Sequence, residues 1–114
     1  MKNKGGFIMK VAVPTIGGLL DEFFYSCEVF TIFTIDENDT IVDVELLYTP
    51  ESCDCKNNIP LTMQQKGVTI MLANIVPEHT EGSCSKYGIT VYLGYTGYVR
   101  DVVQAFLKRQ MVVN

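Results

Sequence analysis

Ile8-Met9-Lys10-Val11-Ala12-Val13-Pro14-Thr15 is a nearly continuous apolar run that is rich in valine and closes on a proline and a threonine. Such a run is typical of a central strand that is buried on both faces of a sheet. Val68 to Ala73 (VTIMLA) has the same character. Two doubly buried strands in one short chain predict a sheet with helices on both faces, which is an α/β architecture.

The segment between these two runs predicts a β-hairpin. Glu28 to Ile35 (EVFTIFTI) alternates large apolar residues with threonine, and Ile41 to Tyr48 (IVDVELLY) is a second β-rich run. The short polar turn Asp36 to Asp39 separates them, and two strands across such a turn pair antiparallel. Gly17-Gly18, just after the first strand, is expected to form a permissive loop.

The second half of the chain alternates helices with strands. We expect a short helix that is capped by Asn57 and ended by Gly67, and a second helix from Pro77 to Lys86. Ile89 to Leu93 (ITVYL) predicts a strand. Gly97 to Gln110 predicts a closing helix, because its apolar residues form a single stripe at helical spacing.

The predicted element order is β-β-β-α-β-α-β-α, which gives a five-stranded mixed sheet. Right-handed crossovers make the strands before and after each helix parallel. The first, third, fourth and fifth strands should therefore run in one direction, and strand 2, Glu28 to Ile35, should be antiparallel to them. Because ligands of open α/β sheets bind at the carboxyl ends of the parallel strands, we expect a functional site at that end.

Length and composition favour one compact domain. The chain has 114 residues, of which 47% are hydrophobic and 19% charged, and its formal net charge is −4. We expect a leader or N-terminal extension over residues 1–8 and a single domain over residues 9–114. The basic residues are spread thinly, which argues against nucleic acid as a partner. No apolar run approaches the ~20 residues of a membrane span, and no signal sequence is recognisable, so we expect a cytoplasmic protein.

The four cysteines carry the strongest chemical signal. Cys53 and Cys55 are one residue apart between a predicted strand and a predicted helix, where a loop can aim both thiolates at one soft metal. The pair cannot complete a four-ligand site by itself. Cys27 and the only histidine, His79, are expected at the same end of the sheet, and they are candidates for further ligands. Cys84 is expected to be a buried helix residue.

The carboxylates do not form a catalytic set. Asp36 and Asp39 belong to a turn, while Asp43 and Glu45 share one face of a strand as a solvated edge. The first strand carries no acidic residue, although a nuclease would need clustered acids on central strands to hold magnesium. We therefore do not expect an enzyme. The simplest alternative for Cys53 and Cys55 is that they are two unpaired loop thiols in a reducing compartment.

Several segments together resemble a known family. Met9-Lys10-Val11-Ala12-Val13-Pro14-Thr15 is similar to its opening strand, and Gly67 to Ala73 and Gly88 to Tyr92 are similar to two later ones. The most specific match is Cys53-Asp54-Cys55-Lys56-Asn57-Asn58-Ile59, which resembles a signature of one branch. The family is that of dinitrogenase iron–molybdenum cofactor biosynthesis, or nitrogenase accessory factors of the NifX and NifB C-terminal type. The chain departs from the branch signature at Tyr95, where a cysteine is expected.

The resemblance implies a ribonuclease H-like three-layer α/β/α fold without nuclease chemistry. It also implies a small carrier or chaperone that holds an iron–sulfur or iron–molybdenum cluster in transit between a donor and an acceptor protein. Cys53 and Cys55 would then be the metal ligands, and Cys27 and His79 would be further cofactor-binding residues.

Two alternatives use the same fold differently. The loop of Cys53 and Cys55 can act as a thiol redox switch, which requires a lowered thiol pKa at one of the two. The domain can also be a metal-free interaction module that binds a protein partner through an exposed sheet edge, for example as a homodimer.

Overall fold

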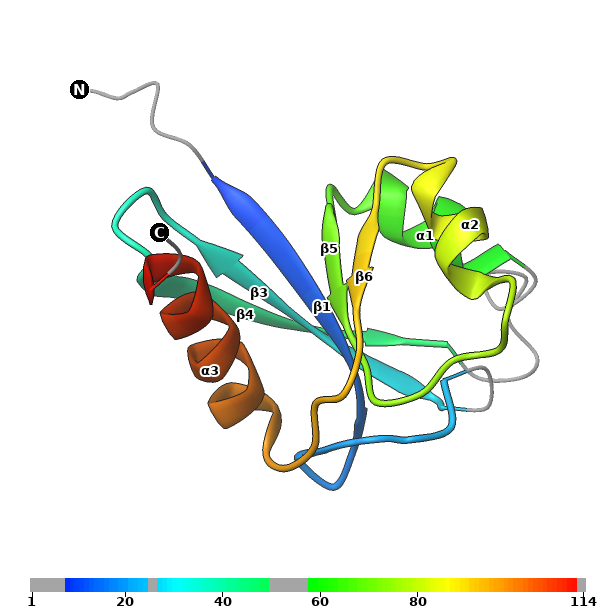
Figure 1. Ribbon diagram of the computed structural model, residues 1–114, viewed down its shortest axis with the longest axis horizontal. Helices are drawn as coiled ribbons and strands as arrows, with labels where there is room; N and C mark the ends of the chain where they lie inside the picture. The colour runs from blue at the N-terminus through cyan, green and yellow to red at the C-terminus, as the bar shows by residue number, and fades with distance from the viewer. Residues whose placement is uncertain (1–7, 25–26, 50–57, 113–114) are drawn as a thin grey trace.

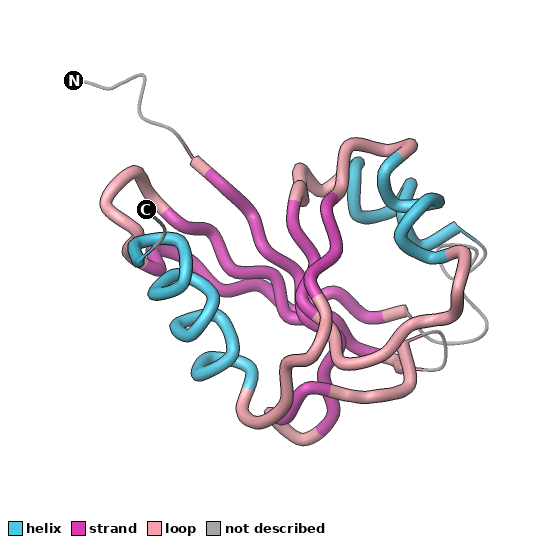
Figure 2. The backbone as a smooth tube through the Cα atoms, viewed as in Figure 1, coloured by secondary structure: helices cyan, strands magenta, loops and turns pink. Residues whose placement is uncertain are grey.

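The computed structural model describes residues 8–24, 27–49 and 58–112. It contains a mixed sheet between two layers of helix, as Figures 1 and 2 show. The elements in chain order are β1 (Met9–Ile16), β2 (Leu19–Leu20), β3 (Val29–Ile35), β4 (Ile41–Tyr48), α1 (Ile59–Gln65), β5 (Ile70–Leu72), α2 (Thr80–Ser85), β6 (Thr90–Tyr92) and α3 (Val99–Val112). The prediction of an α/β architecture with helices on both faces is confirmed.

The strand directions agree with those predicted from the crossovers. The spatial order is β4-β3-β1-β5-β6, with β2 paired to β1. β3 is antiparallel to both β1 and β4, while β5 is parallel to β1 and to β6. The strands β1, β4, β5 and β6 therefore share one direction, and their carboxyl ends meet at one edge of the molecule.

The sheet has six strands where five were expected, because the loop after β1 folds back as β2. Gly17 and Gly18 adopt φ of 57° and 83°, and the chain reverses so that Thr15 pairs with Leu20. β2 continues the sheet where the ladder between β1 and β5 has already ended. Pro14 is tolerated inside this central strand because the ladder to β5 ends before it, so no strand of that side requires the N–H that proline lacks. The ribonuclease H-like relationship stays a prediction.

Two apolar clusters fill the space between the sheet and the helices. Successive residues of β1 point to opposite faces, so that Val11 and Val13 contact one cluster and Ala12 the other. The α3 cluster includes Val102, Val103, Phe106 and Leu107 against Phe33, Ile35 and Leu72. The α1 and α2 cluster includes Ile59, Met63 and Cys84 against Phe30, Ile32 and Met71.

The first two helices are shorter than the sequence predicted, whereas α3 has the predicted length and lies two residues further along the chain. Asn58, and not Asn57, is the N-cap of α1: its side chain accepts a hydrogen bond from the Leu61 backbone N–H at 3.1 Å. α2 begins at Thr80 because the preceding residues, from Pro77, form a turn instead. In the part of the chain that the structure describes, no helix combines the length and the apolar character that a bilayer crossing needs.

Candidate functional site: a groove at the carboxyl end of the sheet

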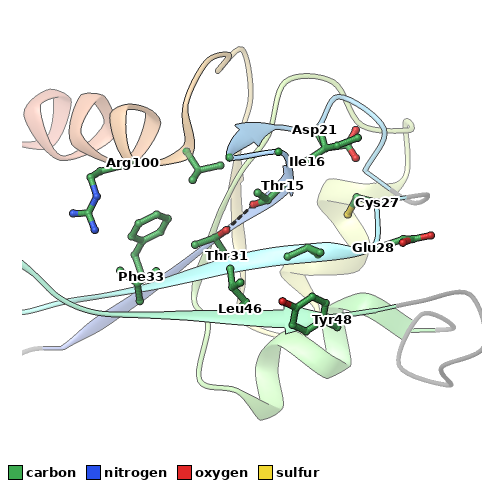
Figure 3. A pocket seen from close by; sticks show the side chains of 15 residues that line it. Thr15, Ile16, Asp21, Cys27, Glu28, Thr31, Phe33, Leu46, Tyr48 and Arg100 are labelled. Atoms are coloured by element: carbon green, nitrogen blue, oxygen red, sulfur yellow. Dashed lines mark hydrogen bonds between the residues drawn. The ribbon is translucent and has the colours of Figure 1, made fainter.

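The larger of two hollows described here is a groove of about 760 Å³ beside the carboxyl end of β1. It lies between the first turn of α3 and the β3–β4 hairpin, and Figure 3 shows its side chains. The lining residues are Thr15, Ile16, Gly17, Gly18, Asp21, Cys27, Glu28, Val29, Thr31, Phe33, Val44, Leu46, Tyr48, Val99 and Arg100. An open, mostly apolar hollow with a few polar groups is typical of a ligand site.

Two buried hydroxyls form the polar floor of the groove (Figure 3). Thr15 Oγ1 donates to the Val13 carbonyl at 2.8 Å, and it lies 2.7 Å from Thr31 Oγ1. Since a hydroxyl has one proton, Thr31 must be the donor to Thr15. The Thr31 side chain is only 3% exposed, and its oxygen lone pairs remain to accept a hydrogen bond.

Backbone hydrogen bonds clamp the loop after β1 against the start of α3. The Val99 N–H donates to the Gly18 carbonyl at 3.0 Å, and the Leu20 N–H donates to the Gly97 carbonyl at 2.8 Å. Leu19 and Tyr98 also pair as an isolated antiparallel bridge. Gly97 has φ of 107°, a conformation that side chains strongly disfavour, so glycine is required here for the approach. The clamp brings Arg100 to one end of the groove.

Cys27 lines the opposite end of the groove, close to Glu28 and Asp21 (Figure 3). Its thiol donates to the Phe24 carbonyl at 3.2 Å, and the residue is buried. Thr49 holds the backbone on both sides: its hydroxyl donates to the Cys27 carbonyl at 3.3 Å, and its N–H donates to the Glu28 carbonyl at 2.8 Å. Thr49 is the last described residue before Asn58, and Cys53 and Cys55 belong to the segment between these two residues, which lies outside the described part of the chain.

His79 lies in a different place. It lines a second hollow of about 410 Å³, together with Asn58, Ile59, Pro60, Ser83, Lys86 and Tyr87. The structure therefore does not bring Cys27 and His79 into one pocket. Cys53 and Cys55 lie outside the described residues, and their role as ligands stays a prediction.

Cys84 is a core residue, as expected. It is fully buried in the cluster beneath α1 and α2, and this burial raises the pKa of its thiol to about 11. A thiol with a raised pKa is a poor ligand and a poor nucleophile, because both roles require the thiolate. Cys84 is thus a suitable control for experiments on the other cysteines.

Sequence reasoning missed the polar residues of the groove. Thr15 and Thr31 are spaced as ordinary strand residues. Arg100 reaches the groove because the turn at Gly97 holds the start of α3 against the loop of Gly17 and Gly18. Tyr95, at the position where the branch signature has a cysteine, is a core residue instead, and its hydroxyl accepts a hydrogen bond from Arg109 Nη1 at 3.2 Å.

Among residues 8–24, 27–49 and 58–109, no three histidine, cysteine or acidic side chains are grouped to hold a metal ion.

Comparison with known families identifies the kind of protein. The family profile described as "Dinitrogenase iron-molybdenum cofactor" matches residues 8–109, which is most of the chain. The chain belongs to this family. No curated protein matches the chain.

Solved structures of low sequence identity share the fold of this family member. The crystal structure of the protein PH0822 has a TM-score of 0.79 at 23% identity, over 89% of this chain and 90% of that chain. The apo form of the orange protein from Desulfovibrio gigas has a TM-score of 0.72 at 20% identity, over 93% and 92% of the two chains. A crystal structure from Methanocaldococcus jannaschii has a TM-score of 0.72 at 18% identity, over 91% and 92%.

Proposed function

We propose that this protein is a non-enzymatic carrier for an iron–sulfur or iron–molybdenum type metal cluster in the cytoplasm. It would receive the cluster from a donor protein and pass it to an acceptor protein. Membership of the dinitrogenase iron–molybdenum cofactor family supports cofactor handling, and a structural neighbour is described as an apo form, the term for a protein without its ligand. The cluster is cargo in this proposal, and no chemical step is assigned to the protein.

The observation that carries the proposal is the position of Cys27. It lines the groove at the carboxyl end of the sheet, and Thr49 ties its backbone to the end of β4. Cys53 follows Thr49 by four residues, and an extended chain spans at most about 3.6 Å per residue. Cys53 is therefore within about 14 Å of an anchor that also holds Cys27. A site of Cys27, Cys53 and Cys55 is compatible with this reach, and thiolates suit iron–sulfur clusters.

The groove suits a cluster that must later be released. Its walls are mostly apolar, and Arg100 offers a cation to a thiolate-bound, anionic cluster. His79 belongs to the second hollow, which Asn58 also lines. Cys55 precedes Asn58 by three residues, so a ligand role for His79 requires the cysteine pair to face that hollow instead of the groove.

Anaerobic reconstitution with iron and sulfide tests the proposal. The wild-type protein should acquire the charge-transfer absorption of thiolate-bound iron, and a Cys53→Ser/Cys55→Ser double variant should lose it. Cys27→Ser should weaken the absorption, whereas His79→Ala should leave it unchanged if the cluster sits in the groove. Cys84→Ala is the matched control, because its thiol is buried in the core, and it should bind like wild type. Equal binding by wild type and the double variant would contradict the proposal.

A further inference from the structure

The outer strand of the sheet exposes apolar side chains where none of the described helices covers them. Val44, Leu46 and Tyr48 of β4 are 43%, 50% and 63% exposed, and we call these three residues the β4 stripe. Their cross-strand partners are Phe33, Thr31 and Val29 of β3, which line the groove. The β4 stripe is thus on the α3 side of the sheet and forms the outer wall of the groove.

The apolar surface continues across the groove to its other lip. Ile16 is 62% exposed, and Figure 3 shows it across the groove from Leu46 and Tyr48. On this face α3 packs against β1, β5, β6 and against Phe33 and Ile35 of β3, while α1 and α2 both cover the opposite face (Figure 2). Contiguous apolar surface of this kind marks an interaction site more often than scattered exposed residues do.

Charges are placed asymmetrically along the same surface. Arg100 lies at one end of the groove and Glu28 at the other, next to Asp21 (Figure 3). The surface therefore has an apolar centre, a cationic end and an anionic end. A two-fold axis through its centre would place the cationic end of one copy over the anionic end of the other, which makes the surface complementary to itself.

We propose that two copies of this chain associate through the β4 stripe as a two-fold dimer. The stripe of one copy packs face to face on the stripe of the other, around Leu46. Arg100 of each copy then lies against Glu28 of the partner subunit at the rim. Burial of the apolar centre supplies most of the affinity, and the two rim pairs fix the orientation. The dimer closes the open side of each groove.

Packing of the faces fits the molecule better than pairing of the β4 edges. An edge-to-edge dimer would leave the β4 stripe exposed to water. It would also bring Asp43 and Glu45 of the two copies close together on the other face, where like charges oppose association. Asp43 carries most of this repulsion, because the Glu45 carboxylate is already paired with the Lys66 ammonium at 2.5 Å.

The dimer goes beyond the proposed function and does not depend on it, so it is tested on metal-free protein. Sedimentation velocity over a concentration series from micromolar to submillimolar should show a reversible monomer–dimer equilibrium. Leu46→Lys should weaken dimerisation by about 100-fold or more, since it places a charge at the apolar centre. Ile75→Lys is the matched control: Ile75 is 69% exposed but lies outside the groove, and this variant should dimerise like wild type.

A charge exchange tests the orientation. Arg100→Glu alone and Glu28→Arg alone should each raise the dimer dissociation constant about tenfold, because each creates like-charge contacts at two symmetric places. The double variant Arg100→Glu/Glu28→Arg should return close to the wild-type constant.

A wild-type protein that stays monomeric at every concentration would overturn the proposal. A dimer that is insensitive to Leu46→Lys, or a double variant as weak as the single ones, would overturn it as well. Circular dichroism confirms that each variant is folded.

Discussion

Cys84 shows how burial can make a cysteine thiol unreactive. Its side chain is completely buried among apolar neighbours, and desolvation of the charged form raises the pKa of the thiol to about 11. At neutral pH it is a small apolar core residue. Cys27 differs, because it is held by Phe24 and Thr49 at the wall of a groove.

The raised pKa of Cys84 predicts a loss of stability at high pH. Between about pH 9 and pH 11 the unfolded chain releases the Cys84 proton while the folded protein retains it. The free energy of unfolding should therefore fall with rising pH in this window and be unaffected by this group below it. Urea titrations at pH 8 and near pH 10.5 should show a smaller decrease for Cys84→Ala than for wild type. Equal decreases would contradict the assignment.

The hydroxyl pair in the groove is expected to contribute to stability. Thr31→Val keeps the side-chain volume but removes the donor to Thr15 Oγ1. The variant should lose about 1 kcal/mol of the free energy of unfolding, the typical net value of one hydrogen bond. Thr90→Val, on the exposed side of β6, is the control and should change stability by less than about 0.5 kcal/mol. Chemical denaturation measures both.

At the scale of elements, α1 depends on its cap. The Asn58 side chain accepts from the Leu61 N–H and donates through Nδ2 to the Tyr87 hydroxyl at 3.1 Å, so it also joins α1 to the end of α2. Asn58→Ala should cost about 1 kcal/mol or slightly more, while Asn58→Asp should retain the capping part of this contribution. A thermal melt in which the two variants are equally unstable would show that the cap is not the important contact.

The docking of α3 is expected to dominate the stability of its face of the sheet. Phe106 is buried in the α3 cluster, with its ring 5.0 Å from that of Tyr92 between centroids. Phe106→Ala should cost about 3–5 kcal/mol through lost burial and the cavity left behind. Lys108→Ala, on the exposed side of the same helix, should change the free energy of unfolding by less than about 0.5 kcal/mol. Denaturant titration of the two variants separates packing from helix propensity.

The sequence predicted the larger elements well and the small ones poorly. β1, β3 and β4 follow from long β-rich runs, because each run keeps its apolar, β-branched or aromatic character over seven or eight residues. β2 has only two residues and depends on the turn at Gly17 and Gly18, so it is too short for a periodic pattern to predict it. Alternation identified Asp43 and Glu45 as a solvated face of β4. It could not show that the apolar face of the same strand is exposed too, since that depends on where α3 lies.

At the scale of the whole molecule, topology was predictable because crossovers are right-handed and the carboxyl ends of parallel strands meet. The groove formed where this rule placed the site. The residues that line the groove were not predictable, because the hydrogen bonds of Thr49 and the glycine turns determine which side chains reach it. Cys27 lines the groove, whereas His79 lines the other hollow. Strand order alone places both residues at the same end of the sheet and does not show that they line different hollows.

The central claim is that the cysteines at this end of the sheet hold a metal cluster. Elemental analysis of protein purified without oxygen tests it most directly, with metal and acid-labile sulfide measured per chain for wild type, Cys27→Ser, Cys53→Ser/Cys55→Ser and Cys84→Ala. We predict bound iron, with or without molybdenum, in wild type and Cys84→Ala, less in Cys27→Ser, and none above background in the double variant. A wild-type protein without such metals after purification and reconstitution, or equal metal in all four proteins, would contradict the account.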